Sequence, residues 1–264
     1  MKRSLPISYL FAALLLMSST AARPADTLAL PAEAVVIERT QIPQSIHRDR
    51  ELVLWMLSPE MHDRGAYSES NGYTCREMTL GSYYSGPTRI SLADTRTGAF
   101  INTIQLRYAN RSKDTFDIPY RILADFNYLV PGHEKGFEGK PALLSLRDLN
   151  GDGLALEATF FEAEACMGLE TTMIGYSPRQ DAVIQYHVEL RVAGMSMPRD
   201  LTWVDYLFSE HPTRPRHWSF TIDYTGRGGT LDRYDVHYDR SRERFFGALR
   251  SRRLEVPEPT ASLE

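Results

Sequence analysis

The sequence predicts an all-β protein of antiparallel hairpins, arranged as a sandwich or a small propeller-like array. Short runs of alternating apolar and polar residues recur along the chain, and turn-forming residues separate them. Apolar patterns with helical spacing are hard to find beyond about two turns. We therefore expect residues 48–250 to form a single β-rich domain.

The N-terminus has the composition of an export signal. Lys2 and Arg3 precede the apolar run 10–17, and small residues complete the segment 1–22. This order predicts a signal peptide, so the mature protein is expected to be periplasmic or extracellular. The apolar run is too short to span a membrane and no later segment supplies a span, so we expect no transmembrane anchor after cleavage.

The first elements after the signal differ in periodicity. Residues 23–47 are rich in Pro, Ala and Gln, which predicts a linker or N-terminal arm. The compact apolar run 52–57 predicts a strand that ends before Pro59. Segments 88–94 and 99–106 flank a short turn and predict a hairpin.

The C-terminal half repeats the strand pattern. Alternation is clearest over 182–190, where it predicts one strand with a buried face and a solvent-exposed face. Segments 218–224 and 234–238 flank a glycine-rich turn and predict a second hairpin. Residues 251–264 are expected to form a flexible tail.

One short segment has residue types and spacing that together predict a metal ion. Side-chain oxygens recur at alternate positions in Asp148, Asn150 and Asp152, and a glycine follows where the chain must turn sharply. Calcium prefers oxygen ligands and takes about six to eight of them, so a tightly curled acidic segment suits it. The backbone carbonyl of Leu154 and the carboxylate of Glu157 are expected to complete the protein ligands.

This half-loop resembles the DxNxDG calcium turns of FG-GAP-type and EF-hand-like extracellular loops. The resemblance implies a structural calcium site between two strands and implies no activity. Segments 142–146 and 158–163 fit strands on either side. The loop departs from an EF-hand where Thr159 replaces the bidentate glutamate, and Glu157 is the available substitute. The alternative is a plain turn, because Asn-Gly and Asp-Gly are both strong turn formers.

The chain has two cysteines, Cys75 and Cys166. In an exported protein, an isolated pair is most simply interpreted as one disulfide. The bridge would close a long loop and would lie close to the strand that leaves the calcium loop. Two buried free thiols are the alternative.

Charge and motifs limit the function classes. The net charge is −4, and −6 without the two basic residues of the signal, which argues against a nucleic-acid partner. The basic cluster of Arg250, Arg252 and Arg253 lies beside the tail and is expected to be a solvated end. The sequence contains no HExxH pair and no complete GxSxG elbow, and the catalytic residues are unknown.

A glycan-directed alternative depends on carboxylates and tyrosines. Glu162 and Glu164 alternate along one predicted strand and so share a face. Paired carboxylates of this kind serve glycosidases, but they are also typical of a solvated sheet surface. Tyr73, Tyr83 and Tyr84 lie near turns, where they fit a sugar-stacking platform or ordinary packing.

Residues 72–89 and 140–186 are also similar to uncharacterised exported bacterial proteins, a resemblance that implies no assigned activity. The sequence therefore predicts an exported, non-catalytic β-domain with a structural calcium turn. A glycan or an envelope protein is its expected partner. A glycan-directed hydrolase or carbohydrate-binding module is the alternative.

Overall fold

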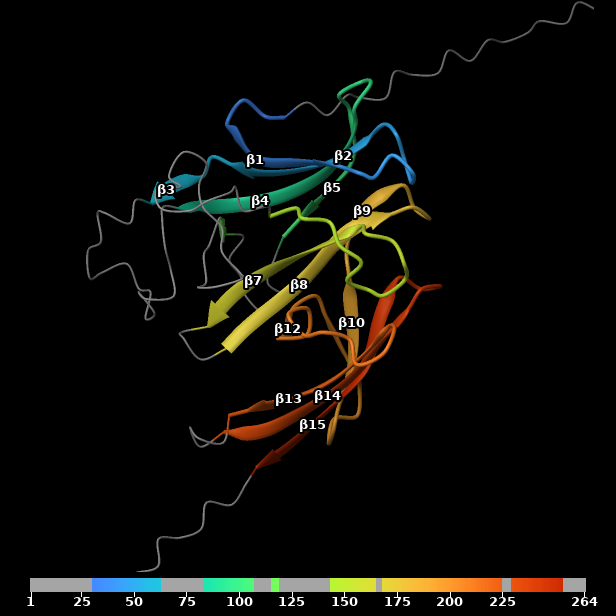
Figure 1. The fold of residues 1–264 in the computed structure, drawn as a ribbon. Helices are drawn as coiled ribbons and strands as arrows, with labels where there is room; N and C mark the ends of the chain where they lie inside the picture. Colours follow the sequence, from blue (N-terminus) through green and yellow to red (C-terminus); the bar gives the residue numbers. More distant parts are fainter. Residues whose placement is uncertain are drawn as a thin grey trace, which may run out of the picture.

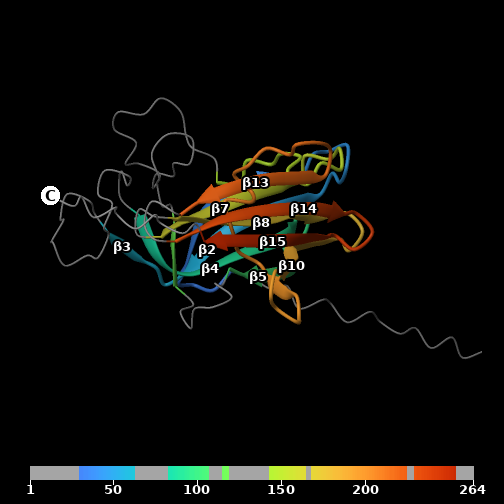
Figure 2. The same cartoon turned by 90° about the horizontal axis from the view of Figure 1, so that it is seen from below.

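The computed structural model shows three stacked β-sheets (Figures 1 and 2). Every regular element is a strand within the part of the chain that the structure describes, which confirms the all-β prediction. The layered arrangement fits the sandwich form of that prediction. No helix in this part is long and apolar enough to cross a membrane. The residues described are 30–62, 83–106, 115–118, 143–164, 168–224 and 229–253.

The N-terminal sheet forms one outer layer. β4 is its central strand and pairs antiparallel with β2, β3, β5 and β6. β4 and β5 form the first predicted hairpin, and β2 contains the predicted strand 52–57. The strands are β1 (Ala34–Gln41), β2 (Arg50–Leu57), β3 (Glu60–His62), β4 (Tyr83–Asp94), β5 (Phe100–Gln105) and β6 (Thr115–Ile118).

Part of the predicted N-terminal arm belongs to this sheet. β1 lies within the segment 23–47 and pairs antiparallel with β2. Its register shifts at a β-bulge between Val36 and Glu38. A bulge inserts a residue into the alternation, so the strand period is interrupted in the sequence. The sequence of this segment therefore does not show the alternation that predicts a strand.

The middle sheet and the C-terminal sheet form the other two layers. The middle sheet contains β7 (Glu157–Glu164), β8 (Gly168–Ser177), β9 (Ala182–Gln185) and β12 (Val204–Asp205). The C-terminal sheet has the order β11 (Arg199–Leu201), β10 (His187–Val192), β15 (Arg244–Arg253), β14 (Thr230–Asp239) and β13 (His217–Asp223). β10 and β15 are parallel, whereas the other pairs of this sheet are antiparallel. β13 and β14 form the second predicted hairpin. β15 extends to Arg253, so residues 251–253 of the predicted tail belong to the sheet, and residues 254–264 lie outside the described residues.

The single strand predicted over 182–190 is divided between two sheets. β9 pairs with β8 in the middle sheet, and β10 joins β15 in the C-terminal sheet. The change occurs at Tyr186. Its ring is buried, and its backbone N–H donates to the carbonyl of Met173 at 2.9 Å. The predicted buried face holds from Tyr186 onward, where Tyr186, Val188 and Leu190 are buried in the second core. In β9 it is wrong, because Val183 is fully buried in the first core whereas Ile184 is only half-buried.

Two hydrophobic cores separate the layers. The first core lies between the N-terminal and middle sheets and includes Leu54, Ile90 and Phe160. The second lies between the middle and C-terminal sheets and includes Trp218 and Phe245. β8 contributes to both, because Ile174 packs in the first core and Met173 in the second. Residues 171–177 are consequently buried without interruption.

Candidate metal centre

The segment that resembles a calcium turn forms a closed loop at the entry to β7. Arg147 and Glu157 close it as an isolated bridge. The Arg147 N–H donates to the Glu157 carbonyl at 2.8 Å, and the Glu157 N–H donates to the Arg147 carbonyl at 3.0 Å. The loop therefore leads directly into a strand, as the sequence predicts for its downstream side.

The strand predicted over 142–146 on the upstream side is not formed in its described part. Leu143 and Leu144 are both buried, so their side chains do not alternate between core and solvent. Their N–H groups donate to the carboxylate of Glu38 at 2.7 and 3.1 Å, where a paired strand would have backbone acceptors. Burial raises the pKa of Glu38, although these two hydrogen bonds lower it. A side chain of β1 thus holds the upstream arm of the loop.

Short hydrogen bonds curl the loop. The carboxylate of Asp148 accepts from the N–H groups of Asp152 and Gly153, both at 3.0 Å. The Asn150 amide oxygen accepts from the Asp152 N–H at 2.9 Å. An oxygen of Asp152 accepts from the Leu154 N–H at 3.0 Å. The side-chain oxygens of Asp148, Asn150 and Asp152 therefore all accept hydrogen bonds from the backbone N–H groups of residues 152–154.

The two glycines of the loop have left-handed backbone conformations. Gly151 has a φ of +72° and Gly153 a φ of +92°. A Cβ atom at Gly151 would lie 2.8 Å from the backbone nitrogen of Arg216, whereas a Cβ at Gly153 would meet nothing within 4 Å. Gly151 is required both for its conformation and for the close packing of the loop against the chain that enters β13.

Glu157 is the buried member of the site, with 1% of its surface exposed. One carboxylate oxygen accepts from the Asn150 amide nitrogen at 3.0 Å and from the Tyr186 hydroxyl at 3.3 Å. The other accepts from the Leu149 N–H at 3.1 Å. Burial raises the pKa of Glu157 to about 8; the hydrogen bond from Leu149 lowers it, and the negative charge of Asp152 raises it further.

The oxygen atoms of the loop belong to the ligand types that calcium prefers. Asp148, Asp152 and Glu157 supply carboxylates, Asn150 an amide oxygen and Leu154 a backbone carbonyl, all of them hard ligands. None of the three carboxylates forms an ion pair with a described lysine or arginine. The Asn150 amide nitrogen instead donates to both Asp152, at 3.4 Å, and Glu157.

A cation in this loop would need the amide and carbonyl oxygens as well as the carboxylates. Within the described residues, no three His, Cys, Asp or Glu side chains are grouped so that they alone could hold a metal. A bound cation would supply the positive charge that the neighbouring side chains lack, and it would favour the charged form of Glu157.

The loop lies where the two hydrophobic cores meet. Leu146, Leu154 and Leu156 pack in the first core, and Leu149 packs against the second. The loop also contacts Arg216 through Gly151, as described above. A cation in this loop would therefore join all three layers of the protein.

Several other predicted site residues lie beyond what the structure describes. Cys75, Cys166 and Tyr73 lie outside the described residues. The side chains of Tyr83 and Tyr84 in β4, and of Glu162 and Glu164 in β7, lie outside them as well. The backbone register opposes Glu162 to Glu170 and Glu164 to Gly168, which agrees with the predicted alternation along β7.

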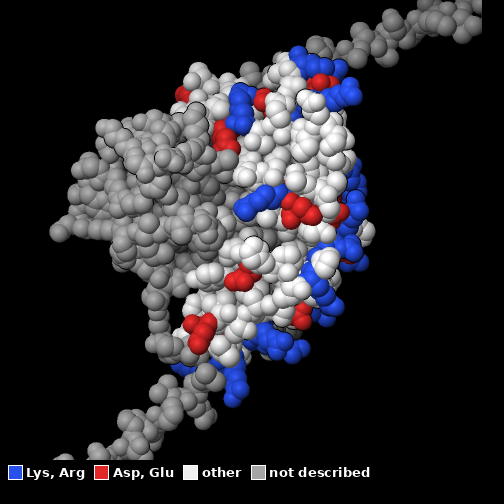
Figure 3. Space-filling view, in the orientation of Figure 1, with Lys and Arg blue, Asp and Glu red and all other residues white. Residues whose placement is uncertain are grey.

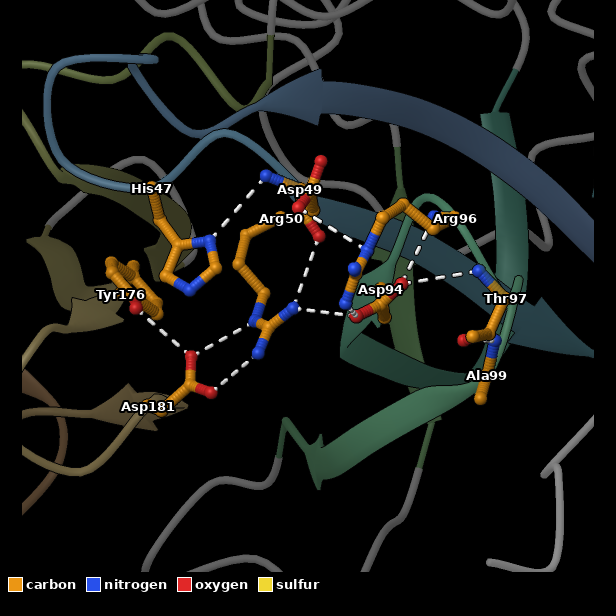
Figure 4. Close-up of polar contacts among 9 residues, drawn as sticks. All are labelled: His47, Asp49, Arg50, Asp94, Arg96, Thr97, Ala99, Tyr176 and Asp181. Atoms are coloured by element: carbon orange, nitrogen blue, oxygen red, sulfur yellow. Dashed lines mark hydrogen bonds and ion pairs between the residues drawn. The ribbon is translucent and has the colours of Figure 1, made fainter. Parts of the chain in front are cut away.

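A second polar cluster, which the sequence analysis did not identify, joins the N-terminal and middle sheets (Figure 4). Arg50 donates to both oxygens of Asp181, at 3.0 and 2.7 Å, and to Asp94 at 2.8 Å. The Tyr176 hydroxyl also donates to Asp181, at 2.9 Å. Since Arg50 and Asp181 are 131 positions apart, no local pattern indicates their contact.

The Arg50 cluster has the character of a structural clamp. Hydrogen bonding to Arg50 lowers the pKa of Asp181. Burial would raise the pKa of Asp94, but hydrogen bonds from the N–H groups of Thr97 and Arg96 and nearby positive charge lower it to about 2. Both carboxylates are therefore charged near neutral pH and are already occupied by donors.

Comparison with known proteins finds no matching family, no matching curated protein and no matching solved structure. The fold and the loop together define a three-layered all-β protein with a candidate calcium site.

Proposed function

We propose that the protein is an exported, non-catalytic β-domain whose loop 148–157 binds a structural calcium ion. The observation that carries the proposal is the placement of Glu157. Its buried carboxylate lies beside Asp148 and Asp152, and no described cationic side chain pairs with any of the three. Calcium supplies the missing positive charge through ligands that it prefers.

The position of the loop gives the ion a structural role. The loop packs against both cores and against the entry to β13, so an ion that stiffens it stabilises the contact between the layers. Ligand binding to the native state alone adds free energy of unfolding according to the excess of ligand over its dissociation constant. The protein then has full stability only where calcium is plentiful, which agrees with the expected export.

Thermal melting of the purified protein tests the calcium site. Calcium at a hundredfold excess over its dissociation constant adds about 2.7 kcal/mol, which raises the melting temperature by about 5–10 °C for a domain of this size. Excess chelator should reverse the rise, and magnesium should reproduce little of it. Equal melting temperatures in saturating calcium and in chelator would contradict the site.

A matched pair of variants separates binding from turn formation. Asp152→Ala removes a predicted ligand and should abolish the calcium-dependent rise, whereas Glu210→Ala removes an exposed carboxylate outside the loop and should retain it. If Asp152→Ala lowers stability equally in calcium and chelator, the residue serves the turn alone. Cell fractionation with mass spectrometry tests export, because protein found only in the cytoplasm with segment 1–22 intact would contradict it.

A further inference from the structure

The outward face of the C-terminal sheet carries a depression of about 570 Å³ that β10, β14 and β15 line. In one row across these strands, Asp235, Ala248 and Arg191 are in register. The methyl group of Ala248 is the only side-chain atom that β15 contributes to this row, so the sheet surface stays open between its neighbours. The opposite face of the same strands packs in the second core through Val188, Val236 and Phe245.

Three arginines surround one end of the depression. Arg233 of β14 lies directly opposite Arg250 of β15, and Arg191 is in register with Ala248 two residues before Arg250. All three side chains are exposed and line the depression. Opposite residues on one face of an antiparallel pair have Cβ atoms about 4.5–5.5 Å apart, and like charges in such pairs are destabilising.

The charge of this arginine cluster, Arg191, Arg233 and Arg250, is not balanced by the carboxylates of the same depression. Glu189 pairs with Arg244 at 3.9 Å, and Asp239 pairs with Arg242 at 3.7 Å. Asp235 lies 3.4 Å from the His217 ring nitrogen, and burial lowers the pKa of that histidine, so Asp235 keeps its negative charge. The arginine cluster forms no ion pair with any residue that the structure describes. The three positive charges of the cluster thus face one carboxylate of the depression, Asp235, that no described lysine or arginine pairs, and an excess of positive charge remains.

The other end of the depression combines a ring surface with hydrogen-bond acceptors. His237 stacks on Phe246 with the ring centroids 5.9 Å apart, and the guanidinium of Arg242 lies 5.2 Å from the Phe246 centroid. Glu189, in register with Phe246, and Asp239 also line this end. Carboxylates accept hydrogen bonds from hydroxyl groups but repel a second anionic group, and aromatic faces pack against rings.

We propose that this depression binds an anionic saccharide, whose carboxylate or phosphate group contacts Arg191, Arg233 and Arg250. Guanidinium groups offer planar pairs of donors that match the oxygens of either anion. The hydroxyl-bearing ring of the ligand lies over the mixed end beside His237 and Asp239. The site uses residues separate from the calcium loop and does not depend on the proposed calcium binding.

The distribution of charge favours a ligand with few anionic groups over a dense polyanion. Glu189, Asp235 and Asp239 line the same depression and would repel closely spaced phosphates such as those of nucleic acid. Over the face shown in Figure 3, charges of both signs are likewise interspersed among the described residues. A saccharide with one anionic group per ligand or per ring matches this pattern.

Calorimetric titration tests the proposal with four probes: a short oligogalacturonate, glucose 6-phosphate, inorganic phosphate and a neutral maltooligosaccharide. We expect saturable binding of the oligogalacturonate, the sugar phosphate or both, and the two probes distinguish a carboxylate from a phosphate preference. The neutral sugar should not bind, and inorganic phosphate should bind at least tenfold more weakly than the preferred acidic sugar. Absence of saturable binding by both acidic sugars, or equal binding of inorganic phosphate, would overturn the proposal.

Variants locate the site on the sheet. Arg233→Ala and Arg250→Ala should each weaken binding of the acidic saccharide at least tenfold, whereas Arg48→Ala, which removes an exposed arginine of another layer, should not. Both substitutions remove one member of a like-charge pair, so thermal melting should show an unchanged or slightly raised melting temperature. Unchanged affinity in both variants, or stronger binding of a DNA duplex than of the sugars, would contradict the assignment.

Discussion

The side-chain amide of Asn150 donates to the buried carboxylate of Glu157 at 3.0 Å, and this bond joins the middle of the loop to the first residue of β7. The same amide nitrogen reaches Asp152 at 3.4 Å. An amide dipole therefore lies between two acidic side chains. In the proposed calcium-bound form, the ion neutralises the two carboxylates in place of the amide nitrogen, and the amide oxygen of Asn150 binds the ion.

Glu157→Gln should separate the charge of the buried group from its shape. Glutamine preserves the size of the side chain but replaces one of its two accepting oxygens by a donor, so we expect the free energy of unfolding in chelator to fall by about 1–3 kcal/mol. The calcium-dependent rise in melting temperature should be lost, because a charged ligand is missing. A rise equal to that of the wild-type protein would show that Glu157 does not bind the ion.

Gly151→Ala should destabilise the protein more than Gly153→Ala. Both positions have a positive φ, which costs about 1 kcal/mol or more for alanine. At Gly151 the new methyl group also meets the Arg216 backbone at 2.8 Å, so the total loss should reach about 2–4 kcal/mol. Urea unfolding in chelator measures both values, and equal losses would show that the loop does not pack closely on the entry to β13.

The Arg50 clamp predicts a loss of stability in acid. The pKa values of Asp94 and Asp181 are lowered in the folded protein, and that of Asp94 falls to about 2. A carboxylate with a lowered folded pKa contributes stability above its unfolded pKa of about 4, and this contribution is lost as the pH falls through the folded value. We therefore expect the melting temperature to fall between about pH 4 and pH 2.

Arg50→Met tests the origin of that acid dependence. The variant should be less stable at neutral pH, and its melting temperature should fall less between pH 4 and pH 2, because Asp181 has lost its main donor. Arg48→Met serves as the control, since Arg48 is exposed and lies two positions earlier. A pH profile of Arg50→Met parallel to that of the wild-type protein would show that other carboxylates cause the acid effect.

Asn102 of β5 should be a sensitive position between the outer and middle layers. Its side chain donates to the Val183 carbonyl at 2.8 Å and accepts from the Val183 N–H at 2.9 Å. It thus supplies β9 with the two hydrogen bonds that a neighbouring strand would give. Asn102→Ala leaves two backbone groups without partners and should cost about 1–3 kcal/mol in the free energy of unfolding. Ile101→Ala, at an exposed neighbouring position, should cost about 0.5 kcal/mol or less.

Local patterns in the sequence predicted the strands well where a single face is buried. Alternation identified the two hairpins because solvent and core impose opposite residue types on successive positions. It failed before Tyr186, where the chain changes sheets and the buried face shifts from Val183 to Tyr186, and at the bulge between Val36 and Glu38. Periodicity therefore identifies buried side chains within one strand, but it loses the phase where the chain passes from one sheet to another.

The candidate site was predictable only in its local part. Asp148, Asn150 and Asp152 lie close in sequence, so their spacing alone indicated a curled loop with oxygen ligands. The roles of Tyr186 and Glu38 arise from distant elements that pack around this loop. The arginine cluster on the C-terminal sheet is also assembled by strand pairing, and the sequence showed only Arg250, as part of an expected solvated end.

The parallel pairing of β10 with β15 has a consequence for the order of folding. β15 lies between β10 and β14, although His187 and its register partner Arg244 are separated by 57 positions. Until β15 has been synthesised, the strands on its two sides have no common neighbour, and the C-terminal layer stays incomplete. Contacts of such long sequence separation form slowly. During this delay the edges of β10 and β14 that face β15 lack its hydrogen bonds, so they are open to pairing with other chains.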